Sequence, residues 1–165
     1  MNPQEALEKL LPSYKRYYNI KTEDVTEPFS AEAEFHSHNE QYILVRSAKI
    51  ADIDSNEFVF FATPETLSNE NFNEFDQKAW ETGLSRVKPV SGHKNSDVTL
   101  IVLCNSIEEE TKKIIKKAKH SKTYMWSLRG WSNYAVIVLQ LSDGKMFYNR
   151  FGKNFRKIVG KVLSN

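Results

Sequence analysis

The sequence is poor in the residues that cross-link secreted proteins or span membranes. Its 165 residues include one cysteine, Cys104, so no internal disulfide can form, which fits a reducing compartment. The purest apolar runs, 100–104 and 135–139, are far shorter than the about 20 residues that cross a bilayer. No basic leader precedes an apolar core at the N-terminus, so we expect no signal peptide. These absences favour a cytoplasmic protein without a membrane segment.

The sequence also lacks the signatures of common nucleotide-binding and hydrolytic enzymes. It contains no glycine-rich phosphate-binding motif and no G-x-S-x-G motif. Cys104 follows an apolar run and is interpreted as a small core residue. A metal-dependent nuclease needs carboxylates beside a lysine, and the carboxylates of Asp52 and Asp54 have no such lysine on a neighbouring predicted strand. No catalytic residue is therefore assigned.

Acidic residues are scarce in the last third of the chain. Residues 1–111 hold 10 Lys and Arg against 20 Asp and Glu, whereas residues 112–165 hold 13 against a single acid, Asp143. The two parts therefore carry net charges of −10 and +12. Either they neutralise each other in the folded domain, or the basic part binds an anionic partner. The same self-complementary charge is compatible with a homodimer.

Residue periodicity predicts a single domain over residues 1–165, of the α+β or mixed α/β class. Asn2 and Glu5 have the spacing of a capping box, so an N-terminal helix should begin there and break at Pro12. Apolar residues alternate with polar ones from Phe29 onwards, and further strand-like runs follow. They cover residues 29–38, 42–45, 48–54 and 56–62, which together predict an antiparallel meander.

The second half predicts a β-α-β unit, then a C-terminal hairpin and helix. After a helical pattern over 72–87, the run 98–103 is apolar throughout, as in a strand covered on both faces. The segment 106–118 begins with a capping box, and its acidic first turn and basic last turn suit a helix dipole. A strand over 134–141 precedes the turn 142–145. We expect one mixed sheet with packed helices.

Three stretches resemble a known family. They are AEFHSHNEQYILVRSAKI, SNEFVFF and VTLIVLCNSIEEETKKIIKK. They resemble a family of small bacterial proteins described as a domain of unknown function, and the resemblance covers most of the chain. It implies a bacterial, cytoplasmic protein and assigns a role to no residue.

The segment EFHSHNEQ is a candidate metal site. Alternate residues of a strand share a face, so Glu34, His36 and His38 would lie about 7 Å apart. Carboxylates and imidazoles suit a divalent transition metal. The alternative is a polar strand face without metal, which the absence of an assigned further ligand favours. A metal-dependent hydrolase or nuclease-like enzyme using this face is therefore the second hypothesis.

The basic third mixes cations with aromatic residues, as proteins that bind single-stranded nucleic acids do. Arg129 and Trp131 are predicted to be exposed in a loop or bulge, whereas Phe147 and Phe151 are predicted to fill the core. The favoured hypothesis is a non-enzymatic binding module, without a cofactor, that recognises a nucleic acid or an acidic protein surface. The predicted contacts are Lys122, Arg129, Trp131, Arg150, Arg156 and Lys157.

Overall fold

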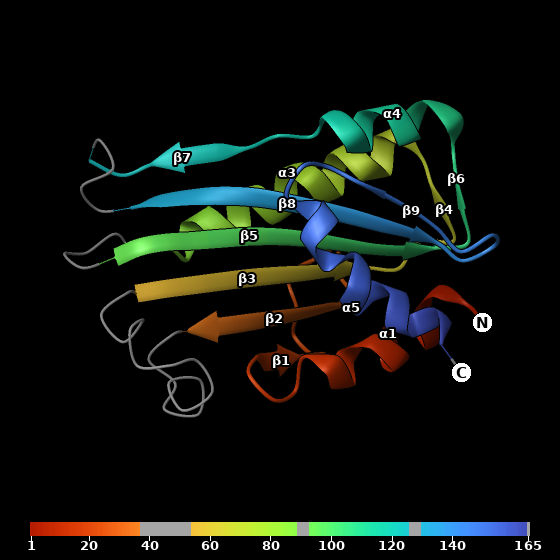
Figure 1. Cartoon of the computed structure of the whole chain (residues 1–165), viewed down its shortest axis with the longest axis horizontal. Coiled ribbons are helices and arrows are strands. Elements are labelled where there is room, and N and C mark those ends of the chain that lie inside the picture. Colours follow the sequence, from red (N-terminus) through yellow and green to blue (C-terminus); the bar gives the residue numbers. More distant parts are fainter. Residues whose placement is uncertain (37–53, 89–92, 126–129, 165) are drawn as a thin grey trace.

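The computed structural model describes residues 1–36, 54–88, 93–125 and 130–164. Its centre is a mixed sheet with the strand order β1-β2-β3-β5-β8-β7, in which β9 also pairs with β8 (Figure 1). The strands are Asn19–Lys21 (β1), Ala31–His36 (β2), Asp54–Ala62 (β3), His93–Cys104 (β5), Ser121–Thr123 (β7), Trp131–Gln140 (β8) and Lys145–Tyr148 (β9). A separate two-stranded sheet joins Thr66–Leu67 (β4) to Ser106–Ile107 (β6). The predicted mixed sheet with packed helices is confirmed.

Three parallel strands, β3, β5 and β8, form the middle of the sheet, and the remaining pairings are antiparallel. The crossover from β3 to β5 contains helix α3 (Asn69–Ser85), and the crossover from β5 to β8 contains helix α4 (Glu109–Lys117). Right-handed crossovers that advance across a sheet in the same direction place their helices on the same face. Helices α3 and α4 accordingly pack on one face of the sheet, here called the back face. No helix in the described ranges is long and apolar enough to cross a membrane.

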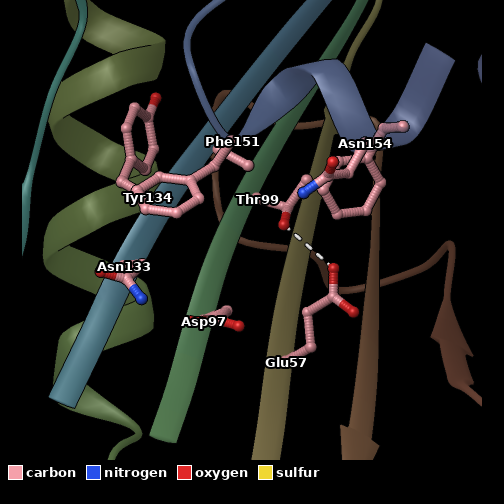
Figure 2. A pocket seen from close by; sticks show the side chains of 9 residues that line it. Glu57, Asp97, Thr99, Asn133, Tyr134, Phe151 and Asn154 are labelled. Atoms are coloured by element: carbon pink, nitrogen blue, oxygen red, sulfur yellow. Dashed lines mark hydrogen bonds between the residues drawn. The ribbon is translucent and has the colours of Figure 1, made fainter.

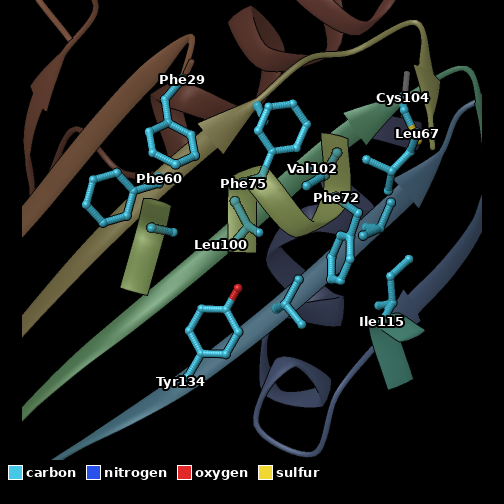
Figure 3. Close-up of a cluster of buried hydrophobic side chains, with 14 of the residues drawn as sticks. Phe29, Phe60, Leu67, Phe72, Phe75, Leu100, Val102, Cys104, Ile115 and Tyr134 are labelled. Atoms are coloured by element: carbon cyan, nitrogen blue, oxygen red, sulfur yellow. The ribbon is translucent and has the colours of Figure 1, made fainter. Parts of the chain in front are cut away.

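The back face is apolar from Phe58, Val98 and Tyr134 onwards, and the polar residues Asn56, Ser96 and Ser132 precede this apolar part. Even-numbered residues of the central strands meet α3 and α4 in one cluster, which includes Phe60, Leu100 and Phe72 (Figure 3). These three side chains are at most 1% exposed. Replacing one such phenylalanine by alanine removes about 3–5 kcal/mol of stability, so this cluster is a principal source of folding free energy.

The opposite, front face is apolar only where helices cover it. Helix α1 (Pro3–Leu10) and helix α5 (Arg156–Gly160) pack on odd-numbered residues such as Phe61, Ile101 and Ile137. Nearer the beginnings of the parallel strands, the odd-numbered positions are polar. They are Glu57, Asp97, Thr99 and Asn133. This polar half of the front face forms part of the candidate site.

The chain termini and turns agree with their sequence signals. The capping box between Asn2 and Glu5 is present, and α1 passes into the 3-10 turn Leu11–Ser13 at Pro12. Gly144 has a φ of 72°, which the turn between β8 and β9 requires. The predicted C-terminal helix is not continuous. It is split into the 3-10 turn Gly152–Phe155, α5 and the 3-10 turn Lys161–Leu163.

Four short strands were not predicted. β1 and β7 have three residues each and β4 and β6 have two, too few to show a clear alternation of polar and apolar residues. β1 and β7 exist because each pairs with the outer edge of a longer neighbour, β2 or β8, and β4 and β6 pair with each other. The strand-like runs 42–45 and 48–53 lie outside the described residues.

Candidate functional site

A break in the pairing along β8 creates the candidate site. β7 pairs with residues 131–133 of β8 and β9 pairs with residues 137–140, and both use the edge opposite β5. Asn149 fills the gap between them. Its Oδ1 accepts a hydrogen bond from the Val136 amide at 3.0 Å, and its Nδ2 donates to the Tyr134 carbonyl at 3.0 Å. The side-chain amide thus replaces the peptide group of a paired strand.

The same side chain ties two further segments to the gap. Nδ2 of Asn149 also donates to the Ala118 carbonyl at 3.0 Å, and Oδ1 also accepts from the Gly152 amide at 2.8 Å. All four hydrogen-bonding positions of this buried amide are therefore used. A Cβ at Gly152 would lie 1.9 Å from the Val136 carbonyl oxygen, so the chain can approach β8 this closely only as glycine.

The gap opens into a pocket of about 330 Å³ that we call the basic pocket. Its walls are Lys116–Ser121, Asn133, Tyr134 and Asn149–Phe151. The cations on these walls are Lys116, Lys117, Lys119 and Arg150, and all four are exposed. Within the described ranges none of the four forms an ion pair. The pocket therefore concentrates positive charge that no ion pair among the described residues neutralises.

His120 lies on the wall of the basic pocket and is held from three sides. Its Nε2 lies 2.8 Å from Oδ2 of Asp76 on α3. Its ring stacks on Trp80, with centroids 5.3 Å apart and planes at 16°, and meets Tyr134 edge-on at 4.8 Å. An ionised carboxylate only accepts hydrogen bonds, so Nε2 carries the hydrogen. In the neutral ring Nδ1 then has the lone pair.

Two buried oxygens lie behind His120. They are Oδ1 of Asp76 and the hydroxyl of Tyr134. Burial, followed by the nearby charge of Asp76 and a hydrogen bond to it, raises the pKa of Tyr134 well above its usual value. This hydroxyl therefore stays protonated, and the charge beside His120 is that of Asp76.

A smaller pocket of about 200 Å³, called the acidic pocket, lies on the front face beside the basic one (Figure 2). It is lined by Glu57, Asp97, Thr99, Asn133, Tyr134, Ala135, Phe151, Asn154 and Phe155. Asn133, Tyr134 and Phe151 line both pockets. The two pockets therefore share a wall made by β8 and the turn that follows β9.

The carboxyls of the acidic pocket are strongly desolvated. Glu57 accepts hydrogen bonds from the Tyr18 hydroxyl and, at 3.0 Å, from the Thr99 hydroxyl. Asp97 accepts one from Asn95 at 3.1 Å, and the backbone of Asn133 also donates to this carboxyl. Burial raises the pKa of both carboxyls. Both therefore hold their protons to a higher pH than exposed carboxyls do.

The structure brings together some of the predicted partner contacts. Arg150 lines the basic pocket, and Trp131 is 42% exposed on β8, where it pairs with β7 beside Lys122. Arg156 and Lys157 are exposed on α5 and do not line the basic pocket. Arg129 lies outside the described residues.

The predicted core position of Phe151 is wrong. Its side chain is 38% exposed and stands between the two pockets, because the chain leaves β9 at Tyr148 and turns into the 3-10 helix. Phe147 does pack against the back-face cluster, as predicted. An exposed ring on a pocket wall is a binding feature that the alternating pattern did not indicate.

The described residues of the candidate metal segment, Glu34 and His36, form polar contacts with other protein groups. Glu34 and His36 share a face of β2, with Nε2 and Oε2 3.4 Å apart. Arg86 donates to Oε1 of Glu34 at 2.8 Å and pairs with buried Glu32 at 2.9 Å. Across the described residues, no three His, Cys, Asp or Glu side chains are grouped to hold a metal ion. His38 lies outside them, so the metal site stays a prediction.

The chain belongs to the family described as a domain of unknown function (DUF8052), which it matches over residues 2–161. No curated protein and no solved structure matches it. The family resemblance in the sequence is thereby confirmed. Family membership brings no activity, ligand or site residue with it.

Proposed function

We propose that this member of the DUF8052 family is a cytoplasmic bacterial protein that binds single-stranded nucleic acid. The contacts would be made by the basic pocket and by the exposed rings beside it. The observation that carries the proposal is the group of cations around one concave site, Lys116, Lys117, Lys119 and Arg150. Phosphate groups are the ligands that such a group attracts most strongly.

In the basic part of the chain, residues 112–165, ion pairs distinguish the lysines that bind neighbouring acids from the cations that are available to bind a ligand. Three lysines pair with nearby acids: Lys112 with Glu109, Lys113 with Glu110 and Lys145 with Asp143. The four pocket cations form no such pair within the ranges that the structure describes. Ion pairs between the acidic and basic parts of the described chain therefore do not neutralise the four pocket cations. This favours the binding of an anion from outside the protein.

Exposed aromatic rings favour a nucleic acid over an acidic protein. Phe151 and Trp131 are 38% and 42% exposed, and Phe151 lines the basic pocket. The Arg150 guanidinium lies 5.6 Å from the centre of the Phe151 ring, so a cation and a stacking surface are adjacent. Stacking on such a ring contributes about 1–3 kcal/mol per base.

The remaining predicted contacts would extend this surface. Lys122 lies on β7, one strand away from the Trp131 end of β8. Arg156 and Lys157 lie on α5, which follows the turn that carries Phe151. In this proposal they are outer contacts whose individual effects are smaller than those of the pocket cations. Arg129 belongs to the same proposed set.

The test is fluorescence anisotropy of labelled oligonucleotides, single-stranded and duplex, at low and physiological salt. About five phosphate contacts should weaken single-strand binding by roughly a hundredfold between about 50 and 200 mM salt. Arg150→Glu and Lys119→Glu should each weaken binding at low salt and lower the salt slope by about one.

Matched controls lie at the opposite end of the strand order. Arg16→Glu and Lys15→Glu make the same charge changes at exposed residues just before β1. These control variants should bind the oligonucleotides with an affinity within about twofold of wild type, because salt screens their charges at that distance from the basic pocket. Equal weakening by controls and pocket variants would contradict the proposal. Binding to polyglutamate but to no oligonucleotide would indicate that the partner is an acidic protein and not a nucleic acid.

A further inference from the structure

We infer that the basic pocket cleaves RNA, with His120 as the general base that activates a ribose 2′-hydroxyl. The inference rests on the proposed function, because the pocket must first hold phosphates. It adds a chemical step and selects RNA as substrate. The residues that carry it are the Asp76–His120 pair and the cations that face it.

The geometry leaves one nitrogen of His120 available. Nε2 is used by Asp76 at 2.8 Å, and Nδ1 makes no hydrogen bond to any described residue. The side chain is 30% exposed and lines the pocket, so solvent and ligand reach it. The parallel contact with Trp80 and the edge contact with Tyr134 fix the plane of the ring. A histidine with a purely structural role does not require a ring nitrogen without a hydrogen-bond partner on a pocket wall.

Asp76 is placed to support a base. Its Oδ2 orients the ring, and the carboxylate lies next to the positive charge that the imidazole gains when Nδ1 takes a proton. The side chain of Asp76 is only 18% exposed, so its charge is weakly screened. We therefore assign Asp76 as a positioning residue and His120 as the catalytic residue.

The step balances without a cofactor. Nδ1 of His120 takes the proton of the 2′-hydroxyl, and the 2′-oxygen attacks the phosphorus of the adjacent phosphodiester. The O2′–P bond forms, the P–O5′ bond breaks, and the leaving 5′-oxygen takes a proton from water. Lys119 and Arg150 stabilise the extra negative charge on the phosphate oxygens. The products are a 2′,3′-cyclic phosphate and a 5′-hydroxyl end, and the imidazolium returns its proton to solvent.

This chemistry separates RNA from DNA. DNA offers the same phosphates and bases but lacks the 2′-hydroxyl that the base must deprotonate. Both nucleic acids should therefore bind in the basic pocket, and RNA alone should be cut.

The experiment incubates the full chain with end-labelled RNA and DNA of one sequence in EDTA, which silences metal-dependent contaminating nucleases. RNA should yield 2′,3′-cyclic phosphate ends. His120→Ala should lower the cleavage rate by about a hundredfold or more. Free imidazole should restore part of the rate to this variant, which a structural role of His120 does not allow.

Asp76→Asn should lower kcat with little change in KM, while Asp24→Asn, at an exposed turn, should change neither. Unaltered cleavage in His120→Ala would overturn the inference. Binding of both nucleic acids without cleavage would overturn it too, and would leave the proposed function standing. Failure of both nucleic acids to bind would overturn the two together.

Discussion

The two pockets share a wall but hold their charges differently. The carboxyls of the acidic pocket, Glu57 and Asp97, project from central strands of the sheet, where burial raises their pKa. The cations of the basic pocket come from exposed connections at the sheet edge, such as Lys119 and Arg150. Solvated cations keep their charge at neutral pH, whereas desolvated carboxyls resist ionisation. Position in the sheet therefore decides which pocket presents charge to a ligand.

The wall between the pockets depends on one short turn. Asn149 and Gly152 bring the chain back against β8 after β9 ends, and Phe151 is carried between them. Changes in this turn should affect both pockets, whereas changes deeper inside one pocket should affect that pocket alone. Substitutions in the turn therefore test the wall that the two pockets share, and substitutions deeper inside one pocket test that pocket alone.

The largest effect is expected at Gly152. An alanine Cβ there would lie 1.9 Å from the Val136 carbonyl oxygen and 2.8 Å from its carbon, so backbone must move. Gly152→Ala should lower the free energy of unfolding by about 3 kcal/mol, measured by urea denaturation. It should also weaken oligonucleotide binding, because the turn that carries Arg150 is displaced.

Gly160→Ala is the matched control for this loss. Gly160 is helical, and the nearest atom to its added Cβ is the flexible end of Met146 at 3.4 Å. This variant should be neutral or up to about 1 kcal/mol more stable, because alanine favours the helix. Wild-type stability in Gly152→Ala would show that β8 and the turn are not packed as closely as described.

A smaller effect, visible only as a function of pH, is expected in the acidic pocket. Burial raises the pKa of the Asp97 carboxyl, so the folded state holds its proton more tightly than the unfolded state does. Its contribution to stability is therefore full below the unfolded pKa of about 4 and is lost as the pH rises through the folded pKa. Asp97→Asn should become more stable relative to wild type between about pH 4 and pH 7.

Asp143→Asn should show the opposite trend. The backbone amide of Lys145 and its ammonium lower the pKa of the exposed Asp143 carboxyl. Its contribution is present above the unfolded pKa and is lost as the pH falls through the folded pKa, so the variant should lose stability relative to wild type as the pH rises. Urea denaturation at about pH 4 and pH 7 measures the difference for Asp97→Asn, and a further measurement below about pH 4, where the Asp143 carboxyl titrates, measures the difference for Asp143→Asn. A pH-independent difference for Asp97→Asn would mean that this carboxyl is well solvated.

The central strands and crossovers could be predicted from the sequence because their signals are local. Continuous apolar runs mark β5 and β8, a capping box marks the start of α1, and Gly144 marks the hairpin turn. The excess of basic residues was equally visible. None of these signals depends on which strands become neighbours.

The site could not be predicted because its residues meet only through strand order. Asp76 and His120 are 44 residues apart, and Asn149 bonds to a carbonyl 31 residues away. The basic pocket requires β7 and β9 to share one edge of β8, and no pattern within either strand specifies this. The polar Asn149, two positions from Phe147 and two from Phe151 at a hairpin end, was the one local signal of the gap.

The smallest effect on stability is expected at the shared wall itself. Phe151 is 38% exposed, so Phe151→Ala should lower the free energy of unfolding by less than about 1 kcal/mol. Phe147 packs against the back-face cluster, so Phe147→Ala should cost about 2–3 kcal/mol in the same urea experiment. Equal losses would mean that both rings are packed alike, as their alternating spacing predicts. The larger loss at Phe147 is expected because β9 ends before Phe151, which frees that ring to face a ligand rather than the core.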